Sequence, residues 1–419
     1  MATFSSAVDN LANGSDHLPN DSGMAAEVRV ALLTGGFDRP YAFGLATALA
    51  AKRVLLDVIG SDDVDSPEMH TTPGLTFLNL RGNKETAGLI QRILRIVIYY
   101  SRLVRYAAVA KPRVFHILWN NKFQLLDRIV LMLYYRALGK RIVFTAHNVN
   151  AGKRDGNNSL YNRLTLRAQY RLSDRIFVHT EQMKQELRED FGVQQDKIII
   201  IPFGLNNSVP NTDLTSRDAK QRLGLKPTDK TILFFGGIRP YKGLEYLAEA
   251  FLGLAAARAE YRLIIAGIPK DGYETYLNGI LRKIDGSGFG SQVIQRIEFI
   301  PDAETELYFK AADVLTLPYT HIFQSGVLFL AYSFGLPVVA SDVGSIKEDI
   351  IEGRTGFLCR PRDTADLATR IKTYFESDLF RNLETRRRDI IDYASERHSW
   401  DVVGTITRNL YKELLGKAL

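Results

Sequence analysis

The chain has 419 residues, a mass of 47.2 kDa, and 54 Lys and Arg against 47 Asp and Glu, which gives a net charge of +7. Its 46% hydrophobic and 24% charged residues are typical of globular proteins, and the length predicts roughly two or three domains with sizeable cores. A single cysteine, Cys359, excludes a disulfide framework and a cysteine-based zinc site, and it suits a reducing compartment such as the cytoplasm. The pI near 9.2 allows nucleic acid, anionic lipid or phosphorylated ligands and does not choose among them.

The positive charge is concentrated in one part of the chain. Residues 1–27 carry four acidic residues and no Lys or Arg, a net charge of −4. Residues 28–205 carry 26 basic and 15 acidic residues, a net charge of +11, whereas residues 206–419 carry 28 of each. The whole excess of positive charge therefore lies in the first folded half.

Residues 1–27 are rich in Ser, Asn, Asp and Gly and show no apolar period, so we expect a disordered extension. They lack the basic and apolar regions of a signal peptide. Met24 is an alternative start, and the sequence leaves open whether residues 1–23 are translated natively.

Strand and helix patterns alternate through the rest of the chain in two stretches. The first predicts a strand at 28–36, a helix at about 42–52, and strands at 53–60, 113–119, 141–147, 175–180 and 197–204. The second predicts a strand at 231–237, a helix at about 243–258, and strands at 261–267, 294–300, 312–318 and 337–341. Such alternation favours an α/β fold of two Rossmann-like, doubly wound parallel sheets. Because ligands on these sheets bind beyond the carboxyl ends of the strands, two facing sheets would form a cleft between domains.

Residues 89–110 are the most apolar helical candidate of the first half. Four arginines interrupt the segment and exclude a membrane span: Arg92, Arg95, Arg102 and Arg105. On a helix they occupy an arc of roughly 140°. The expected apolar side consists of Ile93, Ile96, Val97, Tyr100, Leu103, Val104 and Ala107. Two interpretations stay open: a surface helix whose apolar face lies in the core, or a basic segment over 89–113 that contacts anionic lipid or a phosphorylated acceptor.

The segment FFGGIRPYKGLEYLAEAF (234–251) predicts an anion site. A strand ends at Gly236 and Gly237, the chain turns, and a helix opens near Gly243. Arg239 and Lys242 then lie at the edge of the cleft, where free amides and the helix dipole already favour an anion. A surface turn with two solvated cations is the alternative.

The segment at 318–361 predicts a second anion site. Gln324, Ser325 and Gly326 lead into a helix from about Ser325, and the amides up to Val327 would face a ligand. Together, the two segments would bind a diphosphate through one helix N-terminus and two side-chain cations. The chain lacks the G-x-x-x-x-G-K-[ST] pattern, which disfavours a P-loop nucleotidase.

At these segments the chain resembles glycosyltransferase family 4, whose members have the two-domain architecture called GT-B. The residues that carry the resemblance are GGIRPYKGLEYLAEAF (236–251), ADVLTLPY (312–319), AYSFGLPVVASDVGSIKEDIIEGRTGFLCRPRD (331–363) and HSWDVVGTITRNLYKELL (398–415). The resemblance is strong over about 197–415 and weaker over 28–196. It implies an acceptor-side domain at 28–205, a linker at 206–228, a nucleotide-sugar-binding domain at 229–395, and a C-terminal helix at 396–419 that returns to the first domain.

The resemblance implies transfer of a sugar from a nucleotide sugar with retention of anomeric configuration. It assigns roles to individual residues: Arg239 and Lys242 bind the donor diphosphate, Gly237 lies beside the donor, Gly35 and Gly36 close over the diphosphate, and His147 faces the donor sugar. The residues after FIPD (299–302) correspond to the region that holds the base.

One departure from the family concerns two glutamates that usually contact the donor sugar and its ribose. Those positions hold Ile322 and Leu330 here, and QSG (324–326) replaces the usual phenylalanine-glycine turn. The sequence therefore retains the expected phosphate site and leaves the donor sugar, the nucleotide and the replacement for these carboxylates open.

The expected chemistry requires no metal. As the bond to phosphate lengthens, negative charge grows on the departing diphosphate, and Arg239, Lys242 and the amides near Ser325 would stabilise it. The one Asp-x-Asp sequence, Asp63-Val64-Asp65, lies in an acidic loop and is a weak metal candidate.

The remaining histidines in strand-like runs, His116 and His179, are expected to be structural. His147 follows a strand and precedes Asn148, so it is the functional candidate, positioning a sugar hydroxyl or sharing a proton. The polar loop at 151–159 would either close over an acceptor or remain a plain solvated loop.

The favoured hypothesis is a retaining glycosyltransferase of polysaccharide or glycolipid assembly with a glycan or polyprenyl-diphosphate-linked acceptor, cytoplasmic and in peripheral contact with the membrane. A catalytically inactive nucleotide-sugar-binding partner of another transferase is the alternative, and a GT-B epimerase is a third. Only the net charge favours nucleic-acid binding, which is therefore not expected. The linkage and the oligomeric state stay open.

Overall fold

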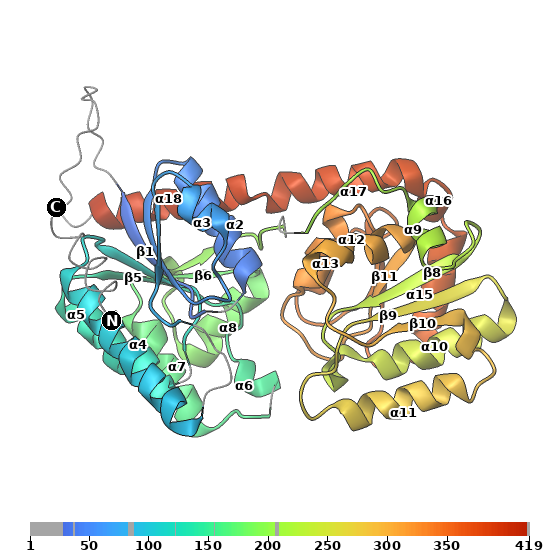
Figure 1. Cartoon of the computed structure of the whole chain (residues 1–419), viewed down its shortest axis with the longest axis horizontal. Helices are drawn as coiled ribbons and strands as arrows, with labels where there is room; N and C mark the ends of the chain where they lie inside the picture. Colours follow the sequence, from blue (N-terminus) through green and yellow to red (C-terminus); the bar gives the residue numbers. More distant parts are fainter. Residues whose placement is uncertain are drawn as a thin grey trace.

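The computed structural model describes residues 28–36, 38–82, 88–121, 123–154, 156–205 and 209–416. Two α/β domains lie side by side, and the last two long helices run along one side of both (Figure 1). The expected disordered extension at 1–27 lies outside the described residues.

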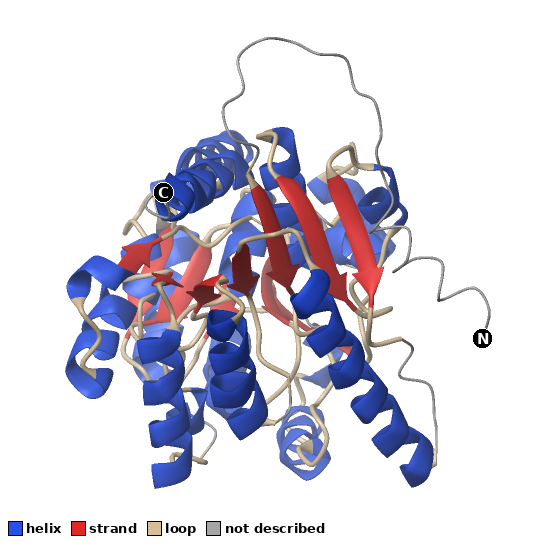
Figure 2. Ribbon diagram, turned by 90° about the vertical axis from the view of Figure 1, so that its left-hand side faces the viewer, coloured by secondary structure: helices blue, strands red, loops and turns tan. Residues whose placement is uncertain are grey.

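The first domain contains a seven-stranded parallel sheet in the order β3-β2-β1-β4-β5-β6-β7. Its strands are β1 (Arg29–Leu33), β2 (Leu55–Gly60), β3 (Leu75–Asn79), β4 (Val114–Ile117), β5 (Arg141–Thr145), β6 (Arg175–Val178) and β7 (Ile198–Ile200). Helices cover both faces of the sheet (Figure 2): α2 (Arg39–Ala51), α3 (Pro67–Thr71), α4 (Leu89–Val109), α5 (Leu131–Ala137), α6 (Ala151–Arg154), α7 (Leu160–Leu172) and α8 (Glu181–Phe191). A π-helical turn at Leu126–Val130 leads into α5.

The second domain contains a six-stranded parallel sheet in the order β10-β9-β8-β11-β12-β13. Its strands are β8 (Lys230–Phe235), β9 (Tyr261–Ala266), β10 (Val293–Arg296), β11 (Val314–Leu317), β12 (Val338–Ser341) and β13 (Gly356–Cys359). Its helices are α9 (Ser216–Arg222), α10 (Leu244–Ala257), α11 (Glu274–Asp285), α12 (Asp302–Ala311), α13 (Gly326–Ser333), α14 (Ile346–Asp349), α15 (Thr364–Glu376), α16 (Asp378–Arg381), α17 (Leu383–His398) and α18 (Trp400–Gly416).

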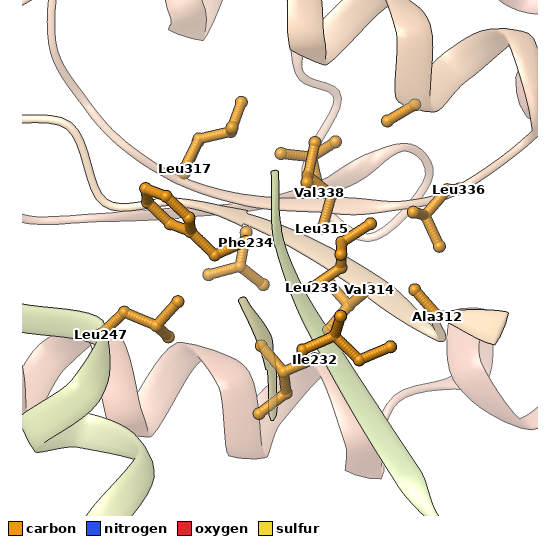
Figure 3. Packing of buried hydrophobic residues seen from close by; sticks show 14 of the residues in the cluster. Ile232, Leu233, Phe234, Leu247, Ala312, Val314, Leu315, Leu317, Leu336 and Val338 are labelled. Atoms are coloured by element: carbon orange, nitrogen blue, oxygen red, sulfur yellow. The ribbon is translucent and has the colours of Figure 1, made fainter. Parts of the chain in front are cut away.

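Buried aliphatic and aromatic side chains hold the central strands of the second sheet together. Residues of β8, β11 and β12 pack against Leu247 of α10 (Figure 3). Ile232, Leu233 and Val314 have no exposed surface. Burying one such side chain contributes about 1.5–3 kcal/mol, so this cluster fixes the strands on which the phosphate-site turns are mounted.

The doubly wound parallel sheets are confirmed, and two strands that the sequence did not predict complete them. β3 and β13 are edge strands of their sheets. β3 is mostly half-buried, and its sequence, LTFLN, contains only one β-branched residue, so it gave a weak strand signal.

The linker expected at 206–228 contains helix α9. Thr215 caps it by accepting a hydrogen bond from the Asp218 amide. Lys220 of α9 is buried and forms an ion pair with Asp313, with 2.9 Å between Nζ and Oδ2. The segment between the two sheets therefore includes a short helix that is anchored on the second domain.

The chain returns from the second domain to the first between α17 and α18. The Leu205 amide donates to the His398 carbonyl at 3.0 Å, and Trp400 Nε1 donates to the Leu205 carbonyl at 2.6 Å. The Trp400 ring lies so close to Gly204 that a Cβ there would approach it to 2.5 Å. Helix α18 then packs on α2 of the first domain (Figure 1).

Helix α4 does not have the apolar face that the sequence predicted. Leu103 and Ala107 are buried together with Tyr99 and Tyr106, as part of the core. Ile93 and Val97, expected on the core side, are more than half exposed. The predicted face was wrong at these two positions and at Val104, which is 39% exposed, because the residues that pack in the core are instead Tyr99, Leu103, Tyr106 and Ala107. Within the described chain, no helix combines the length and the apolar character needed to cross a membrane.

Candidate functional site

The glycine turn after β1 lies close to the loop after β4. Gly35 and Gly36 have φ angles of 62° and 72°, in the left-handed region that favours glycine. A Cβ at Gly35 would lie 2.8 Å from the Trp119 carbonyl oxygen, and Arg81 donates a hydrogen bond to the Gly35 carbonyl. The turn therefore has no room for a larger residue at this edge of the first sheet.

His147 follows β5 and forms a hydrogen-bonded pair with His179, which follows β6. His179 Nδ1 lies 3.1 Å from the Ile201 carbonyl oxygen, so this nitrogen carries the proton and donates. Burial lowers the pKa of His179 to about 4, which leaves its Nε2 as an unprotonated acceptor at neutral pH. His147 Nδ1, 3.0 Å from that Nε2, must therefore be the donor.

The pair leaves one hydrogen-bonding atom of His147 unused. Burial, and next the charges of His179 and His116, hold the pKa of His147 well below its usual value, so the ring is neutral. With the proton on Nδ1, its Nε2 offers a lone pair, and this buried atom has no hydrogen-bond partner among the described residues. An atom in this state can accept a hydrogen bond from a ligand hydroxyl.

Aromatic rings hold His147 in place. Its ring stacks on Trp119 with 4.2 Å between the ring centroids and 5° between the planes. Tyr41 of α2 meets the His147 ring edge-on at 4.6 Å. The neutral imidazole is therefore fixed in orientation as well as in tautomer.

His116 has the structural role that the sequence predicted. Its Nδ1 lies 2.5 Å from Tyr411 Oη of α18, and its Nε2 lies 2.7 Å from Thr145 Oγ1. Both ring nitrogens are used, and the residue ties the C-terminal helix to the first sheet. His179 was also predicted to be structural, and its bond to His147 is a contact that the sequence reasoning missed.

The turn after β8 places Lys242 against the glycines. Gly236 has a φ of 95°, and a Cβ at this position would lie 3.3 Å from Lys242 Nζ and 3.7 Å from Val327 Cγ2. Gly237 is exposed at the end of the strand, and Arg239 lies half-buried at the start of the following 3₁₀ turn. Desolvation, and next the charge of Arg239, lower the pKa of Lys242 to about 8. Two cations thus share one partly dehydrated turn, which an anion would stabilise.

The N-terminus of α13 adjoins this turn. Lys242 Nζ lies 5.8 Å from the centre of the Tyr319 ring, and Tyr319 Oη lies 3.3 Å from Ser325 Oγ. Ser325 precedes the first helical residue, Gly326, without capping the helix through its side chain. The first amides of a helix lack intrahelical partners and favour anions. The structure therefore brings Gly236, Lys242 and the residues from 325 to 327 together.

Gln324 carries a second buried polar atom without a described partner, its Oε1. The Gln324 side chain also hydrogen-bonds with the Asp349 carboxyl. Burial raises the pKa of Asp349 to about 7, and its Oδ1 lies 3.7 Å from His398 Nε2. Asp349 is a buried carboxyl next to the phosphate-site helix that the sequence did not single out.

The two positions where the family usually has glutamate lie in the apolar core. Ile322 and Leu330 are both buried and belong to the hydrophobic cluster of the second domain. No carboxylate therefore reaches the donor side from these two positions.

Phe203 links the two halves of the site. Its ring stacks on Phe329 of α13 with centroids 5.4 Å apart, and it lies 5.1 Å from His179. A Cβ at Gly326 would lie 3.8 Å from the same ring. Ser345 of the second domain also donates to Thr180 of the first at 2.8 Å. The histidine pair and the start of α13 are thus held on either side of one phenylalanine.

Several weaker candidates lie outside this assembly. In the acidic loop, Asp65 pairs with His70 at 2.6 Å. No group of three His, Cys, Asp or Glu suited to a metal exists among the described residues. The segment at 151–159 begins with helix α6, and Asn150 donates a 2.9 Å hydrogen bond to Asn158. Phe299, just ahead of the residues that the resemblance assigns to the base, is exposed before α12.

Comparison with protein families matches both halves of the chain. Residues 40–208 match the family described as Glycosyltransferase Family 4, and residues 229–377 match the family described as Glycosyl transferases group 1. A D-inositol 3-phosphate glycosyltransferase of Acidothermus cellulolyticus is 24% identical over 391 residues, 90% of this chain and 85% of that protein. Another of the same name, from Geodermatophilus obscurus, is 28% identical over 244 residues, 55% of this chain and 50% of that protein. The matched region covers only 50–58% of the length of this relative and of two further D-inositol 3-phosphate glycosyltransferases.

Solved structures share the fold. A sucrose-phosphate synthase of Thermosynechococcus elongatus superposes with a TM-score of 0.75 at 19% identity, over 93% of this chain and 100% of that chain. The Anabaena protein HepE in complex with UDP-glucose superposes with a TM-score of 0.70 at 18% identity, over 93% of this chain and 99% of that chain. With both halves matched and two parallel sheets in place, the chain belongs to glycosyltransferase family 4 and has the GT-B fold.

Proposed function

We propose that this chain is a retaining glycosyltransferase that transfers a sugar from a GDP- or UDP-sugar to a glycan or polyprenyl-diphosphate-linked acceptor in polysaccharide or glycolipid biosynthesis. Membership of family 4 supports sugar transfer, and the UDP-glucose complex of HepE is compatible with a nucleotide-sugar donor. The observation that carries the proposal is the grouping of Lys242, Arg239 and the N-terminus of α13 around one turn.

In the proposed reaction, these groups bind the diphosphate of the donor. As the bond between the anomeric carbon and the phosphate oxygen breaks, negative charge grows on the diphosphate. Arg239 offers a planar fork of donors and Lys242 a point charge. The amides of Gly326 and Val327 add the positive end of the helix dipole. Such preorganised donors stabilise the transition state without having to reorganise.

His147 is proposed to orient the donor sugar. Its Nε2 is an acceptor that lacks a protein partner, so it would accept a hydrogen bond from a sugar hydroxyl. It would not bind a phosphate oxygen, because that oxygen is also an acceptor. Gly35 and Gly36 would close over the diphosphate from the first domain, and Gly237 and Gln324 would lie beside the donor from the second.

The proposal includes two expectations about conditions and place. Because protein cations and amides counter the diphosphate charge, activity should persist when EDTA removes divalent metals. The reaction is placed at the cytoplasmic side of a membrane, where the basic segment at 89–113 would contact anionic lipid.

A donor panel tests the proposal. The purified protein is incubated with GDP- and UDP-sugars, with and without polyprenyl-diphosphate acceptors, and release of nucleoside diphosphate is measured. We expect release from one donor class that increases with acceptor, and proton NMR of the product should show the anomeric configuration of the donor. A product of inverted configuration would exclude the retaining mechanism. Absence of turnover with every donor would exclude glycosyltransferase activity.

A second candidate, a catalytically inactive nucleotide-sugar-binding partner, has one observation in its favour. Ile322 and Leu330 are buried in the core, so the two carboxylates expected at the donor are absent. Tight binding of UDP or GDP without turnover on any donor would favour this candidate.

A further inference from the structure

An open apolar groove of about 1030 Å³ lies on the first domain, outside the site described above. One wall is the middle of α4, and the other is formed by the loop and π-helical turn after β4 and by the residues that lead into α7. The lining residues are Ile96, Val97, Tyr100, Ser101, Val104, Phe123, Gln124, Leu125, Leu126, Val130, Asn157, Ser159 and Tyr161. Most are aliphatic or aromatic, so the groove suits a hydrocarbon better than a sugar.

Apolar side chains also surround the groove. Ile90, Ile93 and Leu94, from the first half of α4, are 81%, 55% and 56% exposed. Further exposed apolar residues lie in α5 and α7, the helices that follow the opposite wall in the chain: Leu133, Leu160 and Leu164. Scattered exposed apolar residues are normal, but a gathering of them in one groove marks an interaction surface. Six apolar lining residues are 39–55% exposed: Val97, Val104, Phe123, Leu125, Val130 and Tyr161.

The groove is a built feature rather than a gap left by loose packing. Asp127, in the π-helical turn, accepts hydrogen bonds from Tyr100 at 2.9 Å, from Asn121 at 3.2 Å and from the Phe123 amide at 3.1 Å. These bonds join α4 to the opposite wall. The π-helical geometry of this wall is uncommon and is frequent at functional sites.

The charge of this region favours an anionic surface as the partner. Between residues 86 and 154 the sequence holds thirteen Lys and Arg and one acidic residue, Asp127. Asp127 is buried, so it contributes little to the outer surface. Arg92 and Arg102 are exposed on α4, on the same helix as the apolar residues. A combination of exposed apolar side chains and cations is typical of proteins that lie in the interface of an anionic bilayer.

The loops that line the groove lead from the strands that carry the proposed donor-sugar residues. Both loops that line it begin at the carboxyl ends of the strands: Phe123 lies four residues after Trp119, and Asn157 ten residues after His147. Trp119 and His147 are the stacked pair of the proposed donor-sugar site. A chain in the groove would therefore belong to a molecule whose head could approach that site.

We infer that this groove binds the hydrocarbon chain of a lipid at an anionic membrane surface, and that it thereby presents the head of a lipid-linked acceptor to the cleft. The inference rests on the proposed function for the acceptor's identity, whereas lipid binding by the groove is independent of catalysis. The inferred membrane contact thus includes the basic face of α4 and also the residues around Phe123 and Tyr161.

The test uses labelled full-length protein and vesicles. Because the only cysteine, Cys359, is buried, a Val97→Cys variant can carry one environment-sensitive dye at the groove. The vesicles contain phosphatidylcholine alone or with phosphatidylglycerol, and a nitroxide lies either on the headgroup or midway along the acyl chain. We expect binding to the anionic vesicles and stronger quenching by the acyl-chain nitroxide. The control dye position is Tyr273→Cys, exposed on the second domain, which should not be quenched.

Unlabelled variants then locate the binding. Val97→Glu and Val104→Glu place a charge at exposed positions of the groove and should weaken vesicle binding by about tenfold or more. Tyr273→Glu should leave vesicle binding unchanged. UDP and GDP binding, measured without vesicles, should be the same in all variants, which separates failure of the groove from failure of the proposed function.

Three results would overturn the inference. Quenching by the headgroup nitroxide alone would mean that only the cations contact the membrane. Absence of binding to both vesicle types would show that the groove does not bind a membrane lipid. A dimer in light scattering that dissociates in Val97→Glu would show that a second copy of the chain covers the groove.

Discussion

The two domains differ in how they use charge. The second domain has no net charge from residue 206 onward, and its site depends on two cations placed beside a helix terminus. The first domain carries the entire positive excess, spread over a surface that also exposes apolar side chains. Placed charges suit a small anion of fixed geometry, whereas distributed charge suits an extended anionic surface.

Charge inside the second domain is paired, and breaking one pair should have the largest effect on stability. Lys220 and Asp313 are 6% and 7% exposed. Lys220→Met would leave Asp313 buried without its cation and should lower the free energy of unfolding by about 3–5 kcal/mol. Urea unfolding measures this change. The matched control is Lys230→Met, which breaks a more exposed pair with Glu260 and should cost about 1 kcal/mol or less.

Removing a placed cation should nearly abolish turnover without unfolding the protein. Lys242→Ala should reduce kcat by about 100- to 1000-fold, equivalent to roughly 3–4 kcal/mol of transition-state stabilisation. Lys283→Ala, on the exposed side of α11, is the matched control and should behave like the wild type. Full activity in Lys242→Ala would contradict the role assigned to the turn after β8.

The placed cation should also give donor binding a pH dependence. Burial and Arg239 lower the pKa of Lys242 to about 8, and a bound diphosphate would raise it again. Donor affinity should therefore be constant below about pH 8 and fall by up to tenfold per pH unit above it, as the free lysine loses its proton. Titration calorimetry between pH 6 and 10 measures the effect. In Lys242→Arg the decline should disappear, because a guanidinium stays charged.

A variant of the histidine pair tests whether the first domain also uses a side chain of fixed position, His147, in the reaction. His179→Phe removes the acceptor for His147 Nδ1 and should reduce kcat/KM by roughly tenfold, the value of one or two hydrogen bonds. Nitrogen-15 NMR should show His147 shifting from a single Nδ1-protonated tautomer to a mixture. An unchanged tautomer with reduced activity would mean that His179 acts only through packing.

The smallest expected effect is a difference in salt dependence between vesicle binding by the first domain and nucleotide binding by the second. Raising the ionic strength screens exposed charges on α4 more than the half-buried Lys242. Vesicle binding should therefore weaken several-fold between low and high salt, while the affinity for UDP or GDP changes less. Equal salt dependence would indicate that both sites depend on diffuse charge.

Much of the fold could be predicted from local patterns. The β-branched runs of the central strands are buried on both faces, so their composition alone distinguishes them from helices and loops. The edge strands β3 and β13 were not predicted because their sequences, LTFLN and GFLC, contain a single β-branched residue between them. The short helix α9 was not predicted because its anchoring contacts include an ion pair between Lys220 and Asp313, residues 93 positions apart.

Part of the site could also be predicted. Gly236, Lys242 and Ser325 belong to strand-to-helix turns, where sequence spacing fixes the approximate geometry. His179 and Asp349 were missed because they have no local signal. Each acquires its partner, His147 or Gln324, only when separate elements pack together.

The sequence by itself determined the alternation of strands and helices, the positions of the phosphate-site turns and the division of charge between the domains, because these depend on residues close together in the chain. The tertiary structure decided which side of α4 is exposed, which tautomer His147 adopts and which buried carboxyl lies beside α13. Those properties depend on burial and on contacts between distant residues, and only the packed chain creates them.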